Sequence, residues 1–151
     1  MQQFELPELD RKKTKEAIEE ALRKYRIYKY LTFEEREASI TPSYEERFHG
    51  ETHQTSDQTA QVAVYNVNEQ QKRKEYCERI ESAVRRLPRM ERFLIEERYM
   101  SADAEYLTDQ NVYNFKFQPP ISQPKYAAIR WRAFYKLALD LKIGVEKSPT
   151  E

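Results

Sequence analysis

The chain contains very little glycine and cysteine. Only two glycines, Gly50 and Gly144, occur in 151 residues. Phosphate-binding loops and dinucleotide-binding turns need glycines between a strand and a helix, so this scarcity excludes both kinds of site. Cys77 is the only cysteine, which excludes an internal disulfide and is typical of a reducing compartment. There is no apolar run of roughly 18 residues and no N-terminal leader pattern. We therefore expect a cytoplasmic protein with no membrane partner.

Charged and aromatic residues are plentiful. They make up 34% and 13% of the chain, and the formal net charge is zero. A neutral total argues against a protein that binds polyanions by charge alone. Abundant Glu, Lys, Arg, Ala and Leu beside scarce glycine predict an all-α protein.

Apolar residues recur at spacings of three and four, which is typical of amphipathic helices. The pattern predicts five helices, at about residues 10–30, 56–87, 88–100, 108–117 and 122–142. Asp10, Thr108 or Asp109, and Ser122 are the expected N-caps, and Gly144 is the expected left-handed C-cap. The predicted organisation is an N-terminal helix at 1–31, a flexible linker at 32–55, a helical domain at 56–146 and a disordered tail at 147–151.

The last two predicted helices carry the functional signal. A short helix, a turn and a longer basic helix over residues 108–142 have the layout of a helix-turn-helix. Residues 122–142 hold five Lys or Arg and one acid. An apolar inner side and a cationic outer side suit a helix that enters the major groove, which is about 12 Å wide. The alternative is a core helix with a solvated basic face. The predicted DNA-binding residues are Ser122, Gln123, Lys125, Tyr126, Arg130, Arg132 and Lys136.

A second basic cluster consists of Arg85, Arg86, Arg89 and Arg92. These four arginines form either a solvated face or a contact to phosphate or RNA polymerase.

The patterns that would indicate a metal or catalytic site are weaker. His49 and His53 lack the further ligands that zinc needs. Cys77 falls at core spacing, and neighbouring Glu residues are typical of solvated charges. We therefore expect no catalytic residue, no metal, no cofactor and no enzymatic activity.

Several segments together carry a family resemblance. The segment at 86–100, which starts Arg86-Leu87-Pro88, is similar to the start of region 4 of sigma factors. With five more segments, at 9–15, 56–60, 76–79, 112–114 and 129–138, the chain resembles the ArpU family of phage and prophage transcriptional regulators from Gram-positive bacteria. The resemblance covers about residues 6–146.

The resemblance implies a sigma region 4-like helix-turn-helix domain with a long preceding helix and a separate N-terminal helix. It also implies sequence-specific binding to double-stranded DNA at a promoter-proximal site and activation of phage late genes. RNA polymerase is one expected partner. A second copy of the chain is the other, because helix-turn-helix proteins often bind as dimers. The turn at Gln118-Pro119-Pro120-Ile121 lacks the glycine that sigma-type turns usually contain between the two helices. We therefore expect the last helix to lie at a different angle from that in sigma factors.

Two other functions fit the same pattern. A DNA-binding assembly protein similar to a phage small terminase subunit also combines a helix-turn-helix with a long oligomerising helix. The second alternative is an interaction module that binds RNA polymerase or a sigma factor without contacting DNA.

Overall fold

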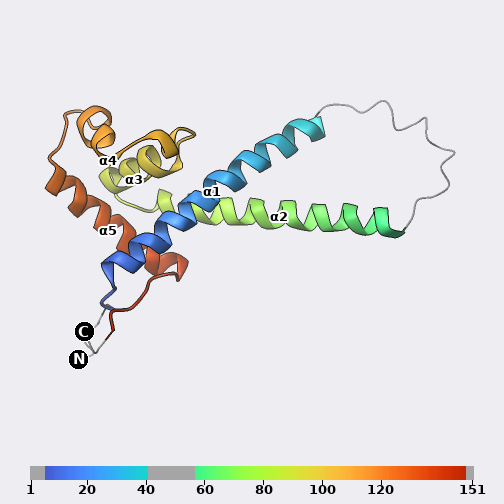
Figure 1. Cartoon of the computed structure of the whole chain (residues 1–151), viewed down its shortest axis with the longest axis horizontal. Helices are drawn as coiled ribbons and strands as arrows, with labels where there is room; N and C mark the ends of the chain where they lie inside the picture. Colours follow the sequence, from blue (N-terminus) through green and yellow to red (C-terminus); the bar gives the residue numbers. More distant parts are fainter. Residues whose placement is uncertain (1–5, 41–56, 149–151) are drawn as a thin grey trace. The chain divides into compact units, whose positions relative to one another are not determined.

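The computed structural model describes residues 6–40 and 57–148, with side chains for residues 6–32 and 67–148. These residues form helices and turns without a strand, which confirms the predicted all-α class (Figure 1). In chain order the elements are α1 (Arg11–Ile40), α2 (Asp57–Arg85), α3 (Arg89–Ile95), the π-helix η2 (Glu96–Met100), the 3-10 helix η3 (Ala104–Tyr106), α4 (Asp109–Asn111), the π-helix η4 (Val112–Lys116) and α5 (Gln123–Leu141).

Three helices start at residues whose side chains cap them. The Asp10 carboxylate accepts a hydrogen bond of 2.9 Å from the backbone N–H three residues later. Thr108 and Asn111 form a reciprocal capping box at the start of α4. The Ser122 hydroxyl accepts from the backbone N–H three residues later at 3.3 Å. Asp10, Thr108 and Ser122 thus confirm the predicted N-caps, because each satisfies a donor that the first helical turn leaves unpaired.

The first helix is longer than the sequence pattern indicated. It continues past residue 31 to Ile40, whereas the predicted linker began at residue 32. Residues 34–38 are Glu-Glu-Arg-Glu-Ala, which favour a helix even without apolar periodicity, and Pro42 lies just beyond the helix end. The rest of that predicted linker and residues 149–151 of the predicted tail lie outside the described residues.

The expectation that Gly144 caps α5 in a left-handed conformation was wrong. Lys142 adopts that conformation instead, with φ 60° and ψ 40°. Gly144 instead lies in close packing. A Cβ atom at this position would lie 3.0 Å from Leu9 Cδ1 and 3.3 Å from Ala138 Cβ.

The left-handed residue predicts a stabilising substitution. Lys142→Gly should raise the free energy of unfolding by about 0.5–1 kcal/mol, because this conformation costs an L-residue about 1–2 kcal/mol and the extra freedom of unfolded glycine offsets part of the gain. Lys142→Ala keeps the strain and removes the same charge, so it is the control. Urea denaturation measures both variants. An equal gain in the alanine variant would assign the effect to the lysine charge.

The chain divides into two compact units. One contains Met1–Arg26 together with Arg79–Glu151, and the other contains Ile27–Glu78. In the first unit, the start of α1 buries Thr14, Ile18, Leu22 and Tyr25. On α5 the buried residues are Tyr126, Ile129, Ala133, Phe134, Leu137 and Ala138. The first half of the N-terminal helix therefore contributes to the core of the unit that carries α5.

The second unit contains the end of α1 and most of α2. The rings of Tyr28 and Tyr76 meet edge to face, with their centroids 5.3 Å apart. Cys77 is 3% exposed, which confirms its predicted role as a small buried side chain.

The first and last described segments pair with each other. Leu9 and Glu146 form an isolated antiparallel bridge, and the Lys147 N–H donates to the Glu8 carbonyl at 3.0 Å. The Thr14 hydroxyl, which is fully buried, donates to the Val145 carbonyl at 3.3 Å. We call these contacts the clasp. They fix the end of α5 to the start of α1.

Candidate nucleic-acid interface

A turn joins the short α4–η4 segment to α5. The Ile121 N–H donates to the Tyr113 carbonyl at 3.1 Å, which closes the turn, and the Gln118–Pro119 peptide bond is cis. Two aromatic contacts connect the segments: the centroid of the Tyr126 ring lies 5.4 Å from that of Tyr113 and 6.5 Å from that of Phe117. The start of α5 is therefore held against the preceding helical segment.

On its outer side, α5 presents a continuous exposed stripe. Lys125, Ala128, Arg132 and Lys136 are all exposed and follow one another at spacings of three or four residues. We call these four residues the α5 stripe. Gln123 is exposed in the first turn of the same helix. Three of the four stripe residues are cationic, and Ala128 is small enough to let another surface approach the helix closely.

The positive charges of the stripe differ in availability. The Lys136 ammonium contacts both carboxylate oxygens of Glu91, at 2.9 and 3.0 Å, and Glu91 is 7% exposed. This ion pair connects α5 to α3 and neutralises part of the Lys136 charge. Lys125 and Arg132 make no ion pair with any residue that the structure describes. They are the available cations of the stripe.

Two of the predicted DNA-binding residues lie on the inner side of the helix. Tyr126 is 1% exposed, and its hydroxyl donates to Asp109 Oδ1 at 2.7 Å. Arg130 donates to Asp109 Oδ2 at 2.7 Å, and its side chain is 18% exposed. Its guanidinium also lies over the Tyr126 and Phe134 rings. Burial and internal hydrogen bonds thus remove Tyr126 and Arg130 from the surface that the sequence assigned to them.

Asp109 is the centre of a half-buried polar cluster. Besides Tyr126 and Arg130, it accepts a hydrogen bond of 3.0 Å from Arg98 Nε. Burial by itself would raise the pKa of Asp109, but the hydrogen bond from Tyr126 and the charges of Arg130 and Arg98 outweigh it and hold the pKa below its usual value. Burial and the same hydrogen bond raise the pKa of Tyr126, so this phenol stays neutral and donates. The Asp109 cluster therefore connects α4 to η2 and to α5.

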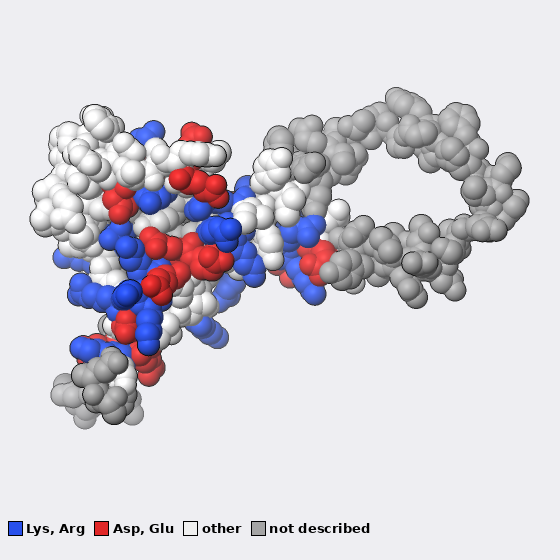
Figure 2. Space-filling model, viewed as in Figure 1, with Lys and Arg blue, Asp and Glu red and all other residues white. Residues whose placement is uncertain are grey.

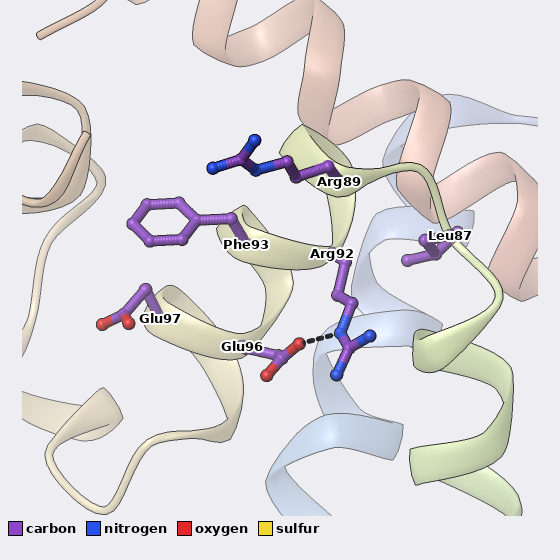
Figure 3. A pocket seen from close by; sticks show the side chains of 6 residues that line it. All are labelled: Leu87, Arg89, Arg92, Phe93, Glu96 and Glu97. Atoms are coloured by element: carbon purple, nitrogen blue, oxygen red, sulfur yellow. Dashed lines mark hydrogen bonds and ion pairs between the residues drawn. The ribbon is translucent and has the colours of Figure 1, made fainter. Parts of the chain in front are cut away.

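The second basic cluster is partly paired internally. Arg86 forms an ion pair with Asp140. Arg92 Nε pairs with Glu96, and this contact is drawn in the close-up of Figure 3. Arg85 and Arg89 are exposed and have no ion pair within the described part of the chain. Of the four arginines, only these two remain available to a partner.

Arg89 lies close to another available lysine. Arg89, Lys116 and Lys125 line the same depression, together with apolar residues of α3 and of the turn. Lys116 is exposed and was absent from the sequence prediction. In the view of Figure 2, by contrast, basic and acidic side chains are interleaved over α1, which gives that surface no single sign of charge.

Two further sequence expectations concern metals and membranes. No group of three or more potential metal-binding side chains occurs within residues 6–32 and 67–148, and His49 and His53 lie outside the described residues. None of the described helices combines the length and apolarity that crossing a bilayer requires.

Sequence reasoning missed the role of Asp109, which it treated as a helix cap. A signal was present in the spacing of α5. Arg130 follows Tyr126 by four residues and precedes Phe134 by four, so it shares their inward face. A cation on an inward face needs a carboxylate partner, and the half-buried Asp109 of the neighbouring helix supplies it.

Comparison with known proteins gives one informative similarity. The chain is 27% identical to an uncharacterized phage-related protein of Listeria innocua, across 95% of this chain and 97% of that protein. No family model matches the chain, and no solved structure matches it. The similarity is to a phage-related protein of nearly the same length.

Proposed function

We propose that this chain is a phage or prophage protein that binds double-stranded DNA, with the α5 stripe in the major groove. The observation that carries the proposal is the pair Lys125 and Arg132. Both are exposed on one stripe with Ala128 between them, and neither has an acidic partner among the described residues. Helices that enter the major groove need a rigid inner side and an outer side with hydrogen-bond donors.

The position along the helix suggests a role for each side chain. Ser122, Gln123 and Lys125 lie at the start of α5, where recognition helices contact base edges. Arg132 lies about two helical turns further along α5, where its side chain would contact a phosphate of the DNA backbone. Arg89 and Lys116 border Lys125 and extend the cationic surface beyond the helix. Lys136 contributes less, because Glu91 holds it.

The biological role follows from two supports, which are the family resemblance and the similarity to a phage-related protein. We infer a non-enzymatic transcriptional regulator that activates phage late genes from a promoter-proximal site. Arg85 is the residue we assign to contact with RNA polymerase, because Arg86 and Arg92 are paired and Arg89 borders the DNA-binding surface. The homodimer predicted from the sequence stays a prediction.

The salt dependence of DNA binding tests this proposal. Selection from a random duplex library should yield a preferred site for the intact chain. On that duplex, Lys125→Ala with Arg132→Ala should weaken binding and reduce the slope of log K against log salt by about one, because the lost phosphate contact of Arg132 removes about 0.9 from the slope. Fluorescence anisotropy at several salt concentrations measures it.

Lys12→Ala with Arg23→Ala is the matched control, because it removes one lysine and one arginine from exposed positions of α1. It should leave the slope unchanged. Failure of the intact chain to enrich any duplex, or equal slopes for the two double variants, would contradict the proposed interface.

A further inference from the structure

A groove with an apolar floor lies between α3 and the turn that precedes α5. Its volume is about 540 Å³. Met90, Phe93, Phe117 and Ile121 provide most of the apolar lining, and the Phe93 and Phe117 rings meet edge to face with centroids 4.9 Å apart. Met90 is 41% exposed, so an apolar side chain is open to solvent here. Grooves of this size accommodate several side chains of a bound segment.

All the charged residues that line this groove are cationic, and we call them its rim. They are Arg89, Lys116 and Lys125, and no Asp or Glu lines the groove. None of the three has an ion pair among the described residues. Figure 3 shows that the side chains of Arg89 and Phe93 project to the same side of α3, while Arg92 points elsewhere, toward Glu96. The groove thus places unpaired positive charge next to exposed apolar surface.

We infer that this groove binds a segment of a partner protein in which large apolar side chains are flanked by Asp or Glu. The apolar side chains would cover Met90 and Phe93, and the carboxylates would pair with Arg89, Lys116 and Lys125. Amphipathic segments that bind in grooves use this combination of apolar anchors and charged flanks. A phosphate backbone would satisfy the cations but leave the apolar floor exposed, so a peptide fits the groove better than DNA does.

Lys125 belongs to both proposed surfaces, but this inference does not rest on the proposed function, because peptide binding is measured without DNA. A random library of displayed peptides is selected on the intact chain. We expect enriched sequences to combine Leu, Phe, Met or Trp with Asp or Glu. A fluorescein-labelled peptide synthesised from the consensus should bind at least tenfold more weakly to Met90→Glu than to the unaltered chain. Changing its Asp and Glu to Asn and Gln should also weaken binding at least tenfold at low salt.

Val67→Glu is the matched control, since it places the same carboxylate on another exposed apolar residue. It should not change peptide affinity. Arg89→Glu and Lys116→Glu alter only exposed rim positions, so they provide the same test if Met90→Glu does not fold. Enrichment of sequences without acids would overturn the inference, as would consensus binding that all three groove variants leave intact. A DNA oligonucleotide whose binding is lost in Met90→Glu would instead assign the floor to nucleic acid.

Discussion

Asp109→Asn should lower the free energy of unfolding by about 2–4 kcal/mol. The substitution removes the charge that pairs with Arg98 and Arg130, whose side chains are only 20% and 18% exposed. Breaking a fully buried ion pair costs about 3–5 kcal/mol, and the Asp109 carboxylate is 37% exposed, so solvent screening reduces the expected loss. Urea denaturation followed by circular dichroism measures the difference.

The loss at Asp109 should depend on pH in a defined direction. The pKa of Asp109 is lowered in the folded chain, against about 3.9 for an unperturbed aspartate. Its stabilising contribution is then fully present above the unfolded value and is lost as the pH falls through the folded value. The difference in the free energy of unfolding between Asp109→Asn and the unaltered chain should therefore be constant from about pH 5 to about pH 7. It should shrink below about pH 4.

Asp103→Asn is the control for this experiment. Asp103 is exposed and makes no capping hydrogen bond with its side chain. Its substitution should change the free energy of unfolding by less than about 0.5 kcal/mol. If the two variants lost similar stability, or if the Asp109 effect grew in acid, the charged cluster would not be the stabilising element.

A second large effect is expected in the first half of α1. Ile18→Ala and Leu22→Ala should each lower the free energy of unfolding by about 2–5 kcal/mol, because both side chains are 1% exposed and each substitution leaves a cavity. Small domains are stable by about 5–15 kcal/mol, so the double variant should be largely unfolded at 37 °C. Thermal denaturation followed by circular dichroism provides the measurement.

Ile27→Ala is a matched control on the same helix, since Ile27 is 42% exposed. It should cost less than about 1 kcal/mol. The same reasoning applies to a fragment restricted to residues 56–146, which lacks Ile18 and Leu22 and exposes the apolar surface that they cover. If Ile18→Ala were as mild as Ile27→Ala, the N-terminal helix would not belong to the core.

The sequence predicted individual helices better than their assembly. Periodicity identified most of the inner side of α5. Short polar side chains identified Asp10 and Ser122 as caps and narrowed the cap of α4 to Thr108 or Asp109, because both features are local. The burial of Ile18 is not a local feature, and the neighbouring Glu19 accepts a hydrogen bond from Tyr99, which lies 80 residues away in the chain. No pattern within residues 10–30 shows which surface their apolar side faces, so the helix was predicted to be separate.

The candidate site was predicted in part, for a similar reason. Exposed positions such as Lys125 and Arg132 follow from helical spacing. The partner of a cation does not, because Asp109 and Glu91 come from other helices and are brought to Arg130 and Lys136 by the fold. Net charge over residues 122–142 therefore overstated the cationic surface, since it counted two charges that internal partners neutralise.

The clasp between Leu9 and Glu146 makes the backbone almost a closed ring. In a ring the position of the chain ends is arbitrary, provided that the contacts between neighbouring segments are kept. Joining the segment before Leu9 to the segment after Glu146 through a linker, and opening the chain between α1 and α2, would preserve every contact described for the unit that carries α5. The clasp itself lies at the opposite end of α5 from Ser122 and Lys125.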